Sequence, residues 1–167
     1  MSAAQKRAAK PARARAPRAP LAAFADETLV VCPRCEGPAV TKRIDPAKAD
    51  TASPRRLVCR RCGHMQEGAG RTLAQGEREG RDPFFGLPLW LATPCCGEVL
   101  WAFNARHLEA LEAPALAQLR ERRRDSAHGW SNAGFTSRMP NWIKSAKNRA
   151  ERFLHLGRLG ARLAEAG

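Results

Sequence analysis

Cysteines carry the clearest chemistry in this sequence of 167 residues, which contains six of them. Four form two pairs in which two residues separate the thiols: Cys32 with Cys35, and Cys59 with Cys62. This spacing lets both sulfurs of one turn reach the same ion, and Zn²⁺ prefers four such ligands in a tetrahedron. We therefore predict one structural zinc ion bound by these four residues. A site of this kind is coordinatively closed, so its expected role is to hold the fold.

Two other interpretations of the paired cysteines are a thioredoxin-like redox motif and a pair of disulfides. A redox CxxC does not need a second pair, and disulfides are rare in the reducing cytosol that we expect for a chain without an evident export signal. Gly37 and Gly63 follow the second cysteine of each pair, where the backbone must turn or leave its amide free to donate to a thiolate. His64 could replace a cysteine as ligand, but four thiolates already complete the tetrahedron, so we expect His64 at the surface.

The adjacent residues Cys95 and Cys96 leave several interpretations open. They could be small buried residues at a hairpin turn, ligands of a second metal together with His107 or His128, or a redox or catalytic centre. No recognised spacing joins Asp82 to either histidine in a catalytic arrangement, and the sequence has no phosphate-binding glycine loop, HExxH or GxSxG motif. We therefore expect no enzymatic activity and no small-molecule substrate.

The net charge of +13 is concentrated at the two ends of the chain. Residues 1–23 carry six basic side chains and no acidic one, and residues 120–167 carry eleven basic and four acidic side chains. Residues 24–119 carry twelve of each and are neutral. Clustered positive charge attracts polyanions and releases their counterions, so nucleic acid is the expected partner.

Basic and amide side chains also recur at helical spacing in the C-terminal segment. Lys144, Lys147 or Asn148, and Arg152 share one stripe of the expected helix, which could lie along a phosphate backbone with Asn148 as a candidate base reader. The alternative is a solvated helix face opposite an ordinary core stripe that includes Trp142. The residues predicted to contact nucleic acid are Arg34, Arg60 and Arg61 beside the paired cysteines, and Lys144, Lys147, Asn148, Arg149 and Arg152 near the C-terminus.

Hydrophobic periodicity and turn residues divide the chain into short strands followed by helices. The expected strands cover residues 28–31, 39–42, 55–58, 82–91 and 98–103. The expected helices begin after Asn104, with a kink or a restart at Pro114, and at Asn141. The expected organisation is a disordered basic arm at residues 1–23, a zinc-binding module at 24–66, a linker at 67–81, and a β-hairpin with a helical region at 82–167. The predicted fold class is therefore α+β.

The motifs Cys32-Pro33-x-Cys35 and Cys59-x-x-Cys62-Gly63 resemble the zinc ribbons of general transcription factors and of many small bacterial proteins. Residues 82–101 and 138–149 look like segments of an uncharacterised family of bacterial zinc-ribbon-containing proteins. The resemblance implies a small antiparallel zinc ribbon over about residues 28–66. Ribbons of this kind are mostly non-enzymatic and contact nucleic acid or a protein partner.

The sequence therefore predicts a cytoplasmic, non-enzymatic zinc protein that binds nucleic acid through its basic arm and basic C-terminal helix. The competing hypothesis is an adaptor whose ribbon and apolar hairpin dock on a larger machine, such as one for transcription or replication. A remote third hypothesis is a thiol or metal enzyme at Cys95 and Cys96. No apolar stretch approaches the roughly 20 residues needed to cross a bilayer, so no membrane association is expected.

Overall fold

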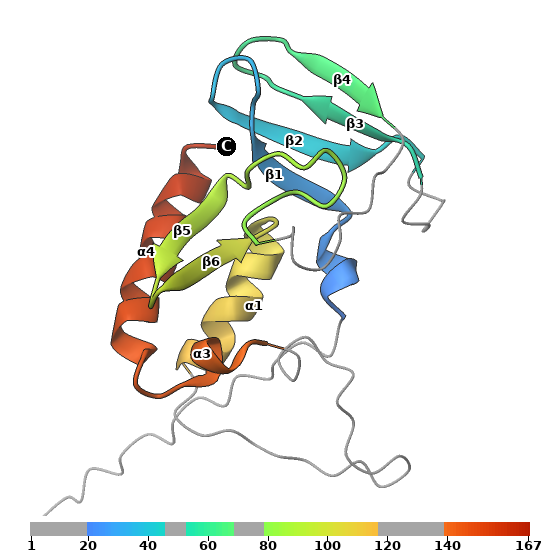
Figure 1. The fold of residues 1–167 in the computed structure, drawn as a ribbon. Coiled ribbons are helices and arrows are strands. Elements are labelled where there is room, and N and C mark those ends of the chain that lie inside the picture. The colour runs from blue at the N-terminus through green and yellow to red at the C-terminus, as the bar shows by residue number, and fades with distance from the viewer. Residues whose placement is uncertain (1–19, 46–52, 69–78, 117–138) are drawn as a thin grey trace, which may run out of the picture.

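The structure is a computed structural model that describes residues 20–45, 53–68, 79–116 (113–116 by backbone only) and 139–167. It has the predicted α+β class: a four-stranded antiparallel sheet, a two-stranded hairpin and helices (Figure 1). The predicted basic arm and linker lie largely outside the described residues. Within the described part of the arm, Leu21–Phe24 form a short 3₁₀ helix, η1.

The four-stranded sheet contains the three strands predicted around the paired cysteines and one further strand. Its strands, in spatial order, are β1 (Glu27–Val31), β2 (Pro38–Arg43), β3 (Arg55–Val58) and β4 (Met65–Gly68), all antiparallel to their neighbours. The sequence of β4, MQEG, has no β-branched or aromatic residue, so local propensity does not indicate a strand there. It becomes a strand because the turn after Cys62 returns the chain alongside β3.

The two faces of this sheet differ in burial, because successive side chains of a strand point to opposite faces. The inner face is buried and includes Thr28, Val30, Ala39, Thr41, Arg55 and Leu57. The outer face carries two cross-strand ion pairs, Lys42 with Glu27 and Arg56 with Glu67, each with an N–O distance of 2.7 Å. Most of the core therefore lies on this side of the sheet, although Leu29 on the other face is buried as well.

The first strand of the hairpin lies later in the chain than predicted. The hairpin consists of β5 (Leu91–Cys95) and β6 (Glu98–Ala102), whereas the sequence pattern places residues 82–90 in its first strand. The carboxylate of Asp82 instead accepts hydrogen bonds from the amides of Phe84 and Phe85, at 3.2 and 2.6 Å, and so closes a turn.

The segment after that turn pairs with the outer edge of β1. The amide of Val31 donates to the carbonyl of Pro88 at 2.8 Å, and the amide of Trp90 donates to the carbonyl of Leu29 at 3.0 Å. Leu29 in turn donates to the carbonyl of Phe103 at 2.7 Å. These backbone bonds join the cysteine-containing sheet to the hairpin.

Two longer helices cover the hairpin (Figure 1). Helix α1 (Ala105–Leu116) begins after Asn104, whose side-chain oxygen accepts the amide of His107 at 3.0 Å and confirms the predicted N-cap. The helix continues past Pro114. The single helix expected from Asn141 is two helices, α3 (Asn141–Lys144) and α4 (Arg149–Ala164), because the chain leaves the helical conformation at Ser145.

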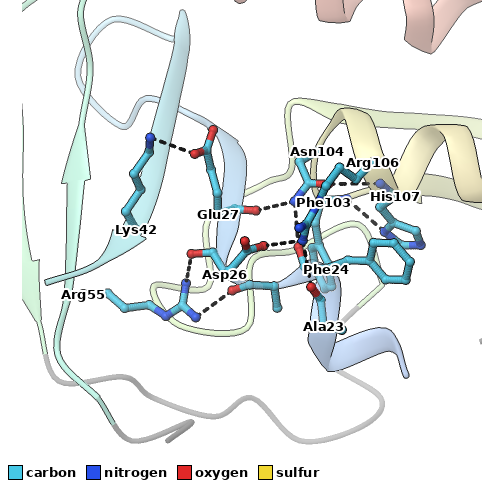
Figure 2. A network of polar contacts seen from close by, with 11 residues as sticks. Ala23, Phe24, Asp26, Glu27, Lys42, Arg55, Phe103, Asn104, Arg106 and His107 are labelled. Atoms are coloured by element: carbon cyan, nitrogen blue, oxygen red, sulfur yellow. Dashed lines mark hydrogen bonds and ion pairs between the residues drawn. The ribbon is translucent and has the colours of Figure 1, made fainter. Parts of the chain in front are cut away.

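Figure 2 shows how side chains fasten η1 and β1 to the start of α1. The amide nitrogen of Asn104 donates to the carbonyls of Phe24 and Glu27, both at 2.7 Å. Arg106 donates to the carbonyl of Ala23 at 2.8 Å and to the carboxylate of Asp26 at 2.9 Å.

One hydrophobic core spans the predicted zinc-binding module and the predicted hairpin with its helices. Its most buried members include Val30, Leu57, Leu91, Leu100, Leu156 and Leu159. Of the helices in the described ranges, none combines the length and the apolar character that a bilayer crossing requires.

Candidate metal centre

Two matching loops position the paired cysteines; we call residues 32–37 and 59–64 the cysteine loops. In each loop the first cysteine accepts a backbone hydrogen bond from the residue after the second one: the amide of Glu36 reaches Cys32 at 3.0 Å, and that of Gly63 reaches Cys59 at 2.9 Å. Glu36 and Gly63 both adopt a left-handed conformation, with φ of 57° and 70°. The two loops therefore have the same turn, although only the second has a glycine at this position.

Gly37 does not make the predicted sharp turn, but its amide donates to the thiol of Cys35, which is the other role that the sequence predicts. A Cβ atom at Gly37 would lie 2.7 Å from Cδ of Arg61 and 3.4 Å from the sulfur of Cys35. The missing side chain therefore lets the two cysteine loops approach each other.

The four sulfurs of Cys32, Cys35, Cys59 and Cys62 come together as predicted. The Sγ atoms of Cys32 and Cys62 are 3.7 Å apart, those of Cys35 and Cys59 are 3.6 Å apart, and all four lie within 4.8 Å of one another. A tetrahedron with metal–sulfur distances of about 2.3 Å has edges of about 3.8 Å. The group could therefore hold a metal ion with little movement of its ligands.

The electrostatics of the cluster also fit a cation. Burial raises the pKa of Cys32. Hydrogen bonds from the Arg34 and Cys35 amides and from neighbouring thiols lower it by more, so the net pKa is about 7. The Gly37 amide lowers the pKa of Cys35, yet burial and the other three thiols together raise it to about 12. Four thiolates cannot share this small volume unless a positive ion offsets their repulsion.

The side chains of Arg34, Arg60 and Arg61 are exposed on the cysteine loops, as predicted for residues that contact a partner. The backbone amide of Arg34 also donates a hydrogen bond to the sulfur of Cys32 at 3.4 Å. The exposed Glu36 is an acidic residue in the same loop.

The C-terminal residues of the predicted basic stripe are not all presented to solvent. Arg152 is only 6% exposed, and the side chain of Asn148 donates to the carbonyl of Trp142 at 3.1 Å. Lys144 is half-buried, whereas Lys147 and Arg149 are exposed. The stripe breaks up because the chain turns between α3 and α4. Figure 1 shows α3 and the start of α4 at the opposite end of the domain from the cysteine loops.

His107, one of the histidines considered as a partner of Cys95 and Cys96, lies elsewhere. It is buried among Phe24, Trp101 and Phe103, and its Nδ1 accepts the amide of Phe103 at 3.1 Å. Burial lowers the pKa of His107 to about 3, so its imidazole is neutral. His128 lies outside the described residues.

Glu151 and His155 of α4 lie beside Cys95 instead. One ligand atom from each of these three residues lies within 4.8 Å of the other two. Burial and the neighbouring Cys96 raise the pKa of Cys95 to about 12, while the Cys96 backbone amide lowers the pKa of Glu151. Sequence reasoning missed this pair of helix residues, although their i, i+4 spacing places them on one helix face and was the available signal.

No family model, curated protein or solved structure matches this chain. The fold and the site by themselves define the class of protein: an α+β protein with a four-cysteine group that could hold a metal ion. The resemblance to zinc ribbons rests on the four cysteines, their spacing and the strands around them.

Proposed function

We propose that Cys32, Cys35, Cys59 and Cys62 bind one structural Zn²⁺ and that the chain is a non-enzymatic protein that binds nucleic acid. The observation that carries the metal assignment is the convergence of four sulfurs within 4.8 Å on two matching loops. Bound zinc would supply a cross-link between the β1–β2 and β3–β4 turns. Thiolates remain available for this role in a reducing compartment, so the proposed location is the cytoplasm.

Positive charge supports nucleic acid as the partner. The chain carries a net charge of +13, and Arg34, Arg60 and Arg61 are exposed on the cysteine loops against a single acidic residue there, Glu36. Arginine suits phosphate because its planar guanidinium donates two parallel hydrogen bonds. We propose this end of the domain as the contact surface, with the basic arm of residues 1–23 adding charge.

The basic C-terminal segment has a smaller part in this proposal than the sequence predicts. Arg152 is buried and the side chain of Asn148 donates to the carbonyl of Trp142, so neither is included in the surface. Helix α3, the start of α4 and the turn between them carry Lys144, Lys147 and Arg149. These elements lie at the other end of the domain (Figure 1) and would contact a nucleic acid only if it wrapped around the protein.

The test is a salt titration of binding with full-length, zinc-loaded protein and labelled duplex DNA, single-stranded DNA and RNA. The variant Arg34→Ala/Arg60→Ala/Arg61→Ala should lower the salt dependence on duplex DNA by about 0.9 in log–log slope for each phosphate that the protein no longer neutralises. The control Lys144→Ala/Lys147→Ala/Arg149→Ala removes the same charge at the other end and should change the slope less. Equal reductions in both variants would reject the proposed surface. Absence of binding to all three nucleic acids at low salt would reject the function.

A second candidate function, docking on a protein partner, is favoured by the outer face of the sheet. Val58 and Met65 are direct cross-strand neighbours there and are 39% and 62% exposed. These two side chains continue a cross-strand apolar row that begins with Leu29 and Val40, and together they could meet an apolar partner. If nucleic-acid binding fails, substitution of both residues by serine and a comparison of captured proteins would test this alternative.

A further inference from the structure

The tip of the hairpin brings a second set of metal-ligating side chains together, apart from the four-cysteine group. Cys95 ends β5, and Cys96 and Gly97 form the two-residue turn to β6. Both turn residues have positive φ, at 57° and 80°, as a type I′ hairpin turn requires. Asparagine, aspartate or glycine is favoured at the first of these positions, and a left-handed cysteine costs about 1 kcal/mol.

The unusual cysteine in the turn keeps its thiol close to its neighbour. The sulfurs of Cys95 and Cys96 are 3.5 Å apart, which is near the edge length of about 3.8 Å expected between two thiolates on one tetrahedral ion. Cys95 is 2% exposed and Cys96 is half-buried, so the pair lies at the boundary between core and solvent.

Helix α4 supplies a carboxylate and an imidazole to the same place. Glu151 and His155 lie one helical turn apart and face β5, and their ligand atoms lie within 4.8 Å of each other and of the Cys95 sulfur. One oxygen of Glu151 accepts the backbone amide of Cys96 at 2.8 Å, and the Cys96 thiol also hydrogen-bonds this carboxylate. Nδ1 of His155 lies 3.4 Å from the hydroxyl of Thr93, a contact that helps to orient the ring.

We propose that Cys95, Glu151 and His155 form a second site for a transition-metal ion such as Zn²⁺, with Cys96 as a fourth ligand. The mixture of sulfur, nitrogen and oxygen donors suits zinc or a similar borderline ion and disfavours Mg²⁺ and Ca²⁺, which require oxygen ligands. Glu151 is exposed, so this site is open to solvent on one side, unlike the four-cysteine group. Its metal therefore exchanges faster and is removed first by a chelator. This inference does not depend on nucleic-acid binding.

The structure offers a simpler role for the same residues, in which Glu151 only fastens the hairpin to α4 through the Cys96 amide. That role needs neither His155 nor Cys95, whereas metal binding needs both of them together with Glu151. The experiment must therefore separate the ligand set from the single hydrogen bond.

The test uses full-length protein and Co²⁺, whose absorption reports its ligands. Wild-type protein should bind about two Co²⁺ per chain, one with the spectrum of a tetrathiolate and one with absorption at shorter wavelength from mixed donors. His155→Gln and Cys96→Ser should each lower the stoichiometry to about one and remove only the second spectrum. The matched control is Glu98→Gln, an exposed acidic residue on the same hairpin outside the ligand set, which should still bind two.

The two substituted ligands are not fully buried, so both variants should fold, and far-ultraviolet circular dichroism will verify this. Binding of a single Co²⁺ by wild type would overturn the proposal. Equal stoichiometry in wild type, His155→Gln and Cys96→Ser would do the same. Neither outcome bears on the four-cysteine site, whose tetrathiolate spectrum is read separately, nor on nucleic-acid binding.

Discussion

Asn104 connects three elements of the fold, and its removal should destabilise the protein through all three (Figure 2). Its side-chain nitrogen donates to the carbonyls of Phe24 and Glu27, both at 2.7 Å, and its oxygen accepts the amide of His107 at 3.0 Å. Asn104 is only 8% exposed, so water cannot readily replace these bonds. Asn104→Ala therefore leaves two carbonyls and one helix-terminal amide without their partner.

The size of the effect follows from those three bonds. Each bond contributes about 1 kcal/mol net to stability, and one of the three is the N-cap of α1. The expected loss for Asn104→Ala is therefore about 3 kcal/mol. For a chain of this length, that loss lowers the Tm by roughly 6–12 °C. Asn104→Ser keeps a capping oxygen but lacks the amide nitrogen that reaches the two carbonyls, so it should lose only about 2 kcal/mol.

Urea unfolding of metal-saturated protein, followed by circular dichroism and tryptophan fluorescence, measures both values. The matched control is Asn141→Ala, because Asn141 is exposed at the start of α3 and should change stability by less than about 0.5 kcal/mol. A stability loss for Asn104→Ala no larger than that of the control would refute the reasoning. A fully stable Asn104→Ser would show that only the cap matters.

Three further predictions concern the metal, a buried histidine and a buried arginine. Cys59→Ser removes one of four converging thiols and should lower the Tm as much as chelation does; added Zn²⁺ should restore the chelated wild type but not the variant. His107 has a pKa lowered by burial from 6.5 to about 3, so the folded state binds fewer protons than the unfolded state between these values. The free energy of unfolding should therefore be highest above pH 6.5 and fall by up to about 1.4 kcal/mol per pH unit toward pH 3. In urea titrations, His107→Gln should flatten this part of the pH profile. The guanidinium of Arg55 donates to the carbonyl of Ala25 at 2.6 Å while lying 3.3 Å from the ring centre of Phe84. A lysine cannot satisfy both contacts, so Arg55→Lys should cost about 2 kcal/mol in urea unfolding, and a value near zero would contradict this geometry.

The four-cysteine group could be predicted because its determinants are local. Each CxxC pair sets the separation of its own two sulfurs within a single turn, and the strands that flank the pairs have apolar residues at the alternate positions that a half-buried strand needs. Asn104 likewise indicated the start of α1, since an N-cap acts on residues only three positions away.

The features that the sequence did not indicate depend on contacts between distant segments. β4 is a strand only because β3 offers it an edge, and residues 82–90 leave the hairpin because β1 offers them another. The spacing of Arg152 in the sequence predicted an exposed cation in a basic helical stripe. The packing of α4 against the hairpin buries it instead.

The two candidate metal groups illustrate this division most clearly. The sequence by itself indicated that Cys32, Cys35, Cys59 and Cys62 would come together in one group that could hold an ion, because two matching local turns separated by a loop can meet in few ways. Only the tertiary structure decided which residues would face Cys95 and Cys96. Glu151 and His155 lie more than fifty positions further along the chain, and neither residue type nor spacing links them to the hairpin until α4 packs on β5. The sequence of a helix does not specify which element its face will contact. That element is decided by where the apolar side of the helix is buried in the tertiary structure.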